Sequence, residues 1–241
     1  MKLQPSLFAA AAPLRRGRSL YTWMSIVIAF VVFTGFARTF YLRGLFPAKP
    51  LTPLVIFHGT LFTTWIVIFI TQVRLVAAGR TDIHRKLGIF ATIVAALMPI
   101  VGTLAAIASA KRGFTPPGGP PPLVFLAIPL SDMIVFTVLV GLALYFRNKS
   151  DFHRRLMLLT TLAILTPAIA RIPMIRPYGI PAFFGIVDLL ILSAIFYDRF
   201  RRGRYHPAFL YGGFFIIVSQ PARILIARTT LWHHFAAWLT R

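Results

Sequence analysis

The sequence contains no cysteine in 241 residues. Without cysteine the chain cannot form a disulfide, a thiolate nucleophile, a cysteine-ligated metal cluster or the covalent attachment of a c-type haem. These four classes of site are therefore excluded from the outset.

Acidic residues are also scarce, because the chain has five aspartates and no glutamate against 26 Lys and Arg, for a formal net charge of +21. In a soluble protein such a charge would suggest a nucleic-acid partner. Here the cations lie in short gaps between apolar runs, where membrane topology and anionic lipid head groups account for them. We expect a lipid bilayer as partner and no nucleic acid.

Familiar catalytic patterns are missing too. The sequence has no H-E-x-x-H motif and no phosphate-binding glycine loop, and no Ser, His and Asp can be placed together at one depth. We therefore predict no catalytic residue. With no cysteine and few acids, we also do not expect a dedicated divalent-metal site.

Long apolar runs dominate what is present. Apolar residues make up 58% of the chain, and the mean hydropathy is +0.78. Each run is close to the ~20 residues that a helix needs to cross a bilayer. The sequence predicts an all-α bundle of seven transmembrane helices, at 20–42, 53–78, 86–109, 122–147, 155–175, 180–198 and 207–227.

The distribution of Lys and Arg predicts the orientation of the bundle. The N-terminus and the gaps after the second, fourth and sixth runs carry four cations each, sixteen in all, against ten on the other side. Since the cytoplasmic side of a membrane protein is enriched in Lys and Arg, we expect the N-terminus inside and the C-terminus outside.

The same pattern divides the chain into three parts. Residues 1–19 form a basic cytoplasmic segment, and 20–227 form the transmembrane domain. Residues 228–241 are predicted to be an amphipathic helix in the outer interface, because Leu231, Phe235, Trp238 and Leu239 share one helical face.

Two aspartates interrupt apolar runs, and an acid inside a membrane normally faces a partner or a water-filled cavity. Other runs place polar residues at a similar depth in the outer half. We therefore predict a polar binding centre formed by His58, Asp132, Arg171, Asp188, Gln220 and Arg223. An alternative is that each group satisfies a local backbone need, or that the arginines reach the outer surface.

Further signals accompany this predicted centre. T-P-A-I-A-R at 166–171 and S-Q-P-A-R at 219–223 each place a proline in the outer half of a run, where it removes one helical hydrogen bond. In the second run, His58, Trp65 and Gln72 recur at seven-residue steps and can share one inward face.

One short motif occurs twice. T-D-I-H-R-K-L at 81–87 returns as S-D-F-H-R-R-L at 150–156, on the predicted cytoplasmic side. Asp82 and Asp151 would serve as helix N-caps. Capping does not require histidine, however, and His84 and His153 occupy the same position in both copies. If the copies cooperate, the two imidazoles lie close together, whereas a separation beyond ~15 Å leaves independent caps.

Three segments between the second and fifth runs share a distinctive polar pattern. They read H-G-T-L-F-T-T-W (58–65), Q-V-R-L-V-A-A-G-R-T-D-I-H-R-K-L-G (72–88) and D-F-H-R-R-L-M-L-L-T-T-L-A-I-L-T-P-A-I-A-R (151–171). These segments resemble a family of bacterial polytopic membrane proteins of uncharacterised function. The resemblance covers about half of the chain and implies a multi-pass protein of the bacterial inner (cytoplasmic) membrane, with no established reaction.

A looser similarity is to transmembrane b-type cytochromes, in which histidines on neighbouring helices ligate haem. It implies His84 and His153 as axial ligands, with Arg85 and Arg154 near the haem propionates. This sequence differs from the cytochrome pattern at His58, which has no histidine partner on the fourth run.

Three functions remain open at this point. The first is a small-solute or proton-coupled carrier or binder that uses the predicted polar centre. The second is a membrane redox protein linked to haem b or quinone. The third is a non-catalytic subunit or assembly factor of a larger membrane complex.

Overall fold

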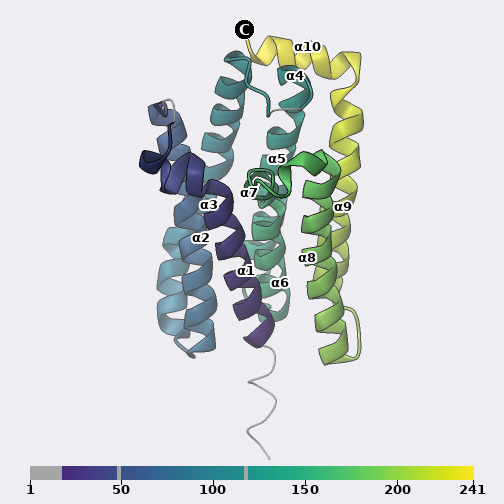
Figure 1. Cartoon of the computed structure of the whole chain (residues 1–241). Coiled ribbons are helices and arrows are strands. Elements are labelled where there is room, and N and C mark those ends of the chain that lie inside the picture. Colours follow the sequence, from purple (N-terminus) through teal and green to yellow (C-terminus); the bar gives the residue numbers. More distant parts are fainter. Residues whose placement is uncertain (1–17, 48–49, 117–118) are drawn as a thin grey trace, which may run out of the picture.

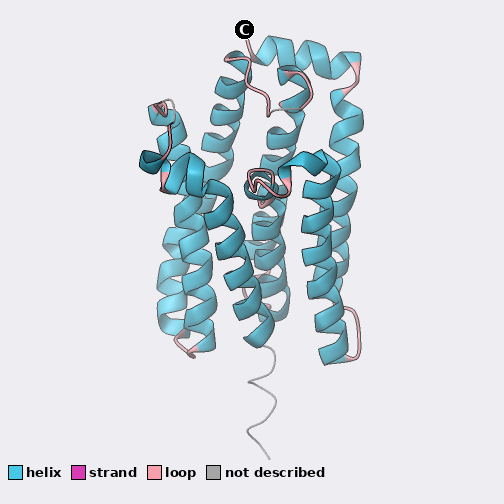
Figure 2. Cartoon of the chain, viewed as in Figure 1, coloured by secondary structure: helices cyan, strands magenta, loops and turns pink. Residues whose placement is uncertain are grey.

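The computed structural model describes residues 18–47, 50–116 and 119–241, and every regular element in these ranges is helical (Figure 2). Most of the predicted basic N-terminal segment, with Lys2, Arg15 and Arg16, lies outside the described residues, as does Lys49. The elements in chain order are α1 (Arg18–Phe36), the π-helix η1 (Ala37–Tyr41), the 3-10 helix η2 (Arg43–Leu45), α2 (Pro53–Ala77), α3 (Thr81–Lys111), α4 (Pro122–Phe125), α5 (Ala127–Tyr145), α6 (Ser150–Ala163), α7 (Thr166–Ile169), the 3-10 helix η3 (Arg176–Tyr178), α8 (Gly179–Arg202), α9 (Pro207–Ala227) and α10 (Thr230–Leu239).

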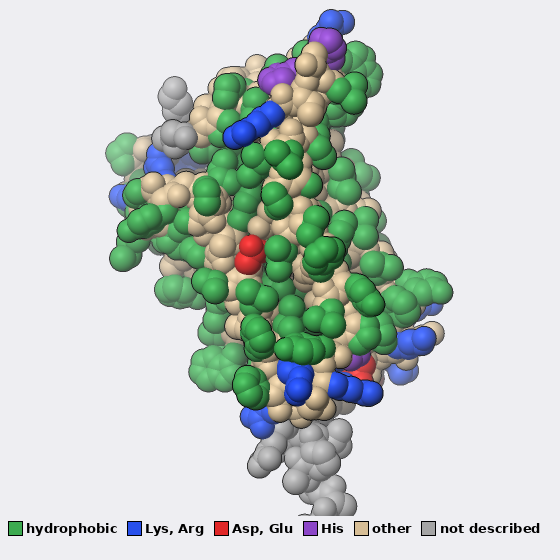
Figure 3. Space-filling model, turned by 90° about the vertical axis from the view of Figure 1, so that its right-hand side faces the viewer, with side chains coloured by type: hydrophobic (Ala, Val, Ile, Leu, Met, Phe, Trp, Pro, Cys, Tyr) green, Lys and Arg blue, Asp and Glu red, His purple; other side chains and the backbone are tan. Residues whose placement is uncertain are grey.

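The long helices run side by side as one bundle (Figure 1). Six stretches of the described chain are long and apolar enough to cross a membrane, namely Leu20–Tyr41, Pro53–Ala77, Thr81–Lys111, Pro122–Tyr145, Arg176–Arg202 and Pro207–Ile226. Hydrophobic side chains cover the middle of the face drawn in Figure 3, and Lys and Arg gather toward its ends. The chain thus has the architecture of a multi-pass membrane protein.

The predicted fifth span, 155–175, differs from the other six. Helix α6 has only 14 residues and ends at Ala163, and α7 adds a single turn. Pro167 has no backbone N–H to donate to Ala163, so the helix breaks within this segment. A broken helix is tolerated here because most of α6 and α7 is buried among neighbouring helices rather than exposed to lipid.

The connections do not all lie at the ends of the bundle, because α7, which joins α6 to α8, lies within its length (Figure 1). The start of α1 and the α2–α3, α5–α6 and α8–α9 turns share one end, which we term the basic end because it contains the cation-rich gaps. Helix α10 lies across the opposite end, and its Trp232 indole nitrogen donates to the Leu123 carbonyl at 2.8 Å. Leu231 and Trp238 of α10 are 81% and 63% exposed.

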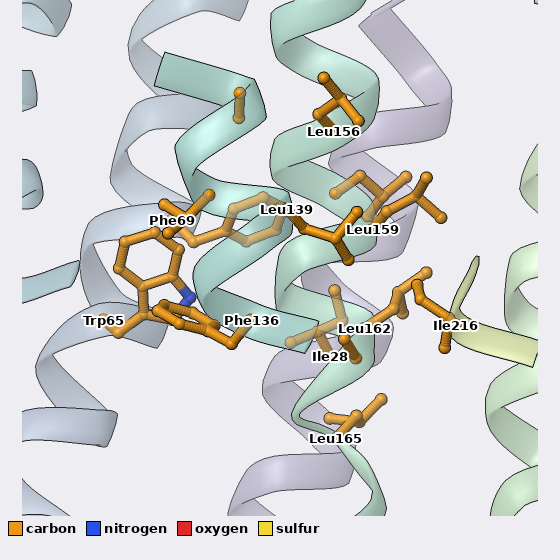
Figure 4. Packing of buried hydrophobic residues seen from close by; sticks show 14 of the residues in the cluster. Ile28, Trp65, Phe69, Phe136, Leu139, Leu156, Leu159, Leu162, Leu165 and Ile216 are labelled. Atoms are coloured by element: carbon orange, nitrogen blue, oxygen red, sulfur yellow. The ribbon is translucent and has the colours of Figure 1, made fainter. Parts of the chain in front are cut away.

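Close packing fixes the centre of the bundle. Trp65, Phe136, Leu139, Leu159 and Leu162 are each at most 1% exposed and meet in the apolar core drawn in Figure 4. Burying such side chains removes apolar surface from water or lipid and fills the interior at near-crystalline density. The core holds α2, α5 and α6 in a fixed register, which in turn fixes the polar side chains that they carry.

Candidate cofactor site and polar residues

The repeated motif brings two histidines together at the basic end. His84 is the fourth residue of α3 and His153 is the fourth residue of α6. Their ring centroids lie 6.3 Å apart, and the ring planes are nearly perpendicular, at 82°. Equivalent positions in two copies of one motif therefore face each other across the bundle.

The aspartates of the motif do not occupy the N-cap positions that the sequence suggested. Arg80 and Lys149 stand there, and neither makes a side-chain capping bond. Asp82 and Asp151 instead lie in the first helical turn, where a carboxylate still interacts favourably with the positive end of the helix dipole. Asp82 pairs with Arg80 at 3.3 Å.

A backbone contact determines which nitrogen of His153 is available. Its Nδ1 lies 2.8 Å from the carbonyl oxygen of Ala143. Because a carbonyl can only accept, Nδ1 carries the proton, and the lone pair of the neutral ring is on Nε2. Histidines that ligate a metal are commonly oriented in this way, by donating their second nitrogen to a backbone carbonyl.

Several polar side-chain atoms at the basic end are buried without a hydrogen-bond partner among the described residues. They are the Nδ1 of His84, the Oε1 of Gln72, the Nε of Arg154 and the hydroxyl of Tyr21. Gln72 itself donates through Nε2 to the His84 carbonyl at 3.1 Å, and the Arg154 guanidinium lies over the Tyr21 ring at 5.8 Å. Buried polar groups normally have partners, so this concentration indicates a place for a ligand or bound water.

The number of ligands limits what the histidine pair can hold. Within the part of the chain that the structure describes, no group of three or more His, Cys, Asp or Glu could hold a metal ion. Structural and catalytic zinc sites use three or four protein ligands. Haem iron takes only its axial ligands from the protein. Two histidines alone therefore suit haem better than a bare divalent ion.

The two rings lie close enough for both to contact one metal atom. Two imidazoles bound on opposite sides of one metal, with metal–nitrogen bonds of about 2.0–2.1 Å, place their centroids on the order of 6 Å apart. The observed centroid separation is 6.3 Å. Arg85, the residue after His84, is exposed and has no ion-pair partner in the described ranges, so its charge is free to meet an anionic group.

The polar residues predicted in the outer half form two separate contacts rather than one centre, and His58 and Arg171 belong to neither. Arg223 of α9 forms an ion pair with Asp132 of α5, and the two side chains are 3% and 4% exposed. The Arg223 guanidinium also donates to the Ser219 carbonyl at 3.1 Å and to its hydroxyl at 2.8 Å. Two residues of the predicted centre therefore do contact each other, and the hydrogen bonds described for this pair are all made within it and to Ser219.

The second contact joins α8 and α9. Gln220 donates through Nε2 to the Asp188 carboxylate at 2.8 Å. Asp188 is half-buried whereas Gln220 is 5% exposed. An acidic side chain is visible within the apolar surface of Figure 3.

The remaining two residues, His58 and Arg171, make no hydrogen bond with each other in the described chain. His58 belongs to α2, and its ring stacks on Phe62 with centroids 4.2 Å apart. Arg171 follows α7. It donates to the Pro167 carbonyl at 2.7 Å and lies 4.8 Å from the centroid of the Phe36 ring. Neither His58 nor Arg171 is hydrogen-bonded or ion-paired to any of the aspartates, all five of which the structure describes.

An ion-pair network at the basic end was not anticipated. Arg155 is fully buried and holds both oxygens of Asp198, at 3.1 Å and 2.5 Å. Arg202 binds both oxygens of Asp151, at 3.1 Å and 2.9 Å. The Arg202 hydrogen bonds lower the pKa of Asp151 to about 2. The sequence could have indicated part of this network, because Asp151 and Arg155, and likewise Asp198 and Arg202, are four residues apart and therefore neighbours on one helix.

No protein-family model, curated protein or solved structure matches this chain. The function is therefore inferred from the helical bundle and from the contacts described above.

Proposed function

We propose that this chain is a redox protein of the bacterial inner membrane that binds one haem b between His84 and His153, with seven crossings and its N-terminus inside. The observation that carries the proposal is the pair of imidazoles 6.3 Å apart, supplied by the same motif at the start of two helices. Haem iron alternates between the ferric and ferrous states and so would supply transfer of one electron.

The surrounding residues have distinct parts in this proposal. The Ala143 carbonyl orients His153 and makes its Nε2 the ligating nitrogen. Arg85 and Arg154 are the cations nearest the pair in sequence. Arg85 would hold a haem propionate by charge-assisted hydrogen bonds, whereas Arg154 already forms an ion pair with Asp151. Half-burial of both histidines at the end of the bundle allows the propionates to remain at the water boundary.

The carrier hypothesis receives less support from the geometry. A carrier or proton-coupled binder needs an acid or base that is free to exchange its partner. Asp132 is already neutralised by Arg223, whose remaining hydrogen bonds are with its own helix. The pair therefore serves better as a fixed link between α5 and α9 than as a binding site.

Absorption spectra of purified variants test the proposal. Wild-type protein, His84→Ala, His153→Ala and the control His233→Ala are purified in mild detergent, and haem per chain is measured. His233 lies in α10, at the other end of the bundle. We expect the Soret band in the wild type and in His233→Ala, and its loss in both of the other variants. Equal haem content in all four proteins would reject His84 and His153 as ligands.

A further inference from the structure

The carboxylate of Asp188 lies deep within a membrane span. Asp188 is in α8, and at 1.5 Å per residue it lies about 14 Å from Gly179 and about 21 Å from Arg202, the two ends of the helix. Its side chain is half-buried, and Figure 3 shows an acidic side chain within the hydrophobic middle of one face. Long side chains such as Lys and Arg can reach the interface from such a depth. The short side chain of aspartate cannot, so the carboxylate stays among apolar groups.

The protein satisfies this carboxylate only in part. The one protein hydrogen bond found for it comes from Gln220 of α9, which donates through Nε2 at 2.8 Å. No Lys, Arg or His of the described residues lies within ion-pair distance of Asp188. A carboxylate has about four lone-pair sites, and an acid inside a membrane normally faces a partner or a water-filled cavity. Asp188 therefore has unused acceptors and no counter-ion within the described chain.

The other intramembrane aspartate has the partner that Asp188 lacks. Asp132 pairs with Arg223, and both side chains are almost completely buried. Arg223 also donates to the carbonyl and the hydroxyl of Ser219, so its guanidinium is already engaged. The counter-charge for Asp188 is therefore expected from a second molecule.

The helix surface around Asp188 is open to a neighbouring helix. Gly185 and Leu192 lie about one turn to either side of Asp188 along α8, and Leu189 follows it. A Cβ at Gly185 would meet no heavy atom of the described chain within 4 Å, and Leu189 and Leu192 are 66% and 38% exposed. Small residues at membrane helix interfaces allow two backbones to approach closely. These four residues form a surface that we term the Asp188 face.

From these contacts we infer that the Asp188 face binds a transmembrane helix of another protein, and that this helix carries a Lys or Arg at the depth of Asp188. The cation pairs with the carboxylate, which Gln220 holds in place by its hydrogen bond. The rest of the partner helix packs on Gly185 and the exposed leucines. A second copy of this chain fits less well, because a two-fold axis through the face would bring two Asp188 carboxylates together. The inference goes beyond the proposed haem function and does not depend on it.

Energy transfer between the full chain and a synthetic membrane peptide tests this inference. Because the sequence has no cysteine, Arg204→Cys gives a single site for a donor dye, at an exposed position just beyond α8. The acceptor is on one of two Leu/Ala transmembrane peptides in phosphatidylcholine vesicles, which differ only in a central Lys or a central Leu. One charge-assisted hydrogen bond predicts that the labelled protein binds the Lys peptide about tenfold more tightly than the Leu peptide.

Variants of the labelled protein show whether this preference comes from Asp188. Asp188→Asn should bind the two peptides with equal affinity, and Asp188→Glu, which keeps the charge, should retain a preference for the Lys peptide. Asp82→Asn is the matched control, since it removes an exposed aspartate at the basic end. We expect it to keep the tenfold preference.

A second variant keeps the test independent of folding at Asp188. Gly185→Leu leaves the carboxylate in place but holds a partner helix away from it, so it should weaken binding of the Lys peptide. Gly141→Leu is its control, because a Cβ at Gly141 of α5 also meets no heavy atom within 4 Å. We expect Gly141→Leu to bind the Lys peptide as tightly as the labelled protein does.

Three results would overturn the inference. The first is equal affinity of the labelled protein for the two peptides. The second is an unchanged affinity for the Lys peptide in both Asp188→Asn and Gly185→Leu. The third is energy transfer between two copies of the chain that is lost in Asp188→Asn and is unaffected by the Lys peptide, because the face would then join two copies.

Discussion

Arg223 of α9 and Asp132 of α5 form an ion pair in which both side chains are almost completely buried. The pair links two helices that are 91 residues apart in sequence. Its Arg223 also lies over the Phe184 ring of α8, at 5.4 Å from the ring centroid. One side chain therefore ties three helices together.

Removing one member of this pair should destabilise the bundle strongly. Asp132→Asn leaves the Arg223 charge buried without a counter-ion, and we expect a loss of about 3–5 kcal/mol in the free energy of unfolding. The double variant Asp132→Asn with Arg223→Gln should recover much of that loss, because no unpaired charge remains. Thermal unfolding in detergent, followed by circular dichroism, measures both. A double variant less stable than Asp132→Asn would contradict this account.

Gly35 should be intolerant of any side chain. A Cβ at this position would overlap the backbone carbonyl of Ala168, so α1 and α7 could not keep their close approach. Gly35→Ala is expected to cost about 1–3 kcal/mol through this overpacking. Gly141→Ala is the control, since a Cβ there meets no atom within 4 Å. Equal unfolding midpoints for the two variants would show that α1 and α7 are not packed as described.

The hydrogen bonds from Arg202 make the stabilising contribution of Asp151 depend on pH. Its pKa is lowered to about 2 in the folded protein, compared with about 3.9 for an aspartate in an unfolded chain. The folded state therefore favours the carboxylate, and the contribution is complete above about pH 4 and lost as the pH falls toward 2. Asp151 is 48% exposed, so solvent screening keeps the effect modest.

Comparing the wild type with Asp151→Asn checks this dependence. The difference between their unfolding midpoints should be largest at pH 6 and should shrink as the pH is lowered to 2.5. A difference that stays constant over this interval would mean that Asp151 does not contribute through its charge.

The helical class and the six long membrane helices could be predicted from the apolar runs, because length and hydropathy are local properties of the sequence. The break between α6 and α7 could be predicted only in part from the sequence. Pro167 marked a lost hydrogen bond, but the sequence does not show that the surrounding helices bury this segment well enough to let it stop at Ala163.

The polar residues illustrate a similar limit. Depth along a helix can be counted from the sequence, and it correctly placed Asp132 at the height of Arg223. The sequence does not show which neighbouring helix each of these side chains faces. This is why His58 and Arg171 were grouped with aspartates that they do not contact. The histidine pair was easier to foresee, because a repeated motif gives two helices the same starting register.

The most direct test of the central claim is the visible spectrum of the wild-type protein, purified from haem-supplemented cells and recorded before and after dithionite reduction. Coordination by His84 and His153 predicts a Soret band, sharp α and β bands on reduction, and one haem per chain. A folded but colourless protein would contradict it.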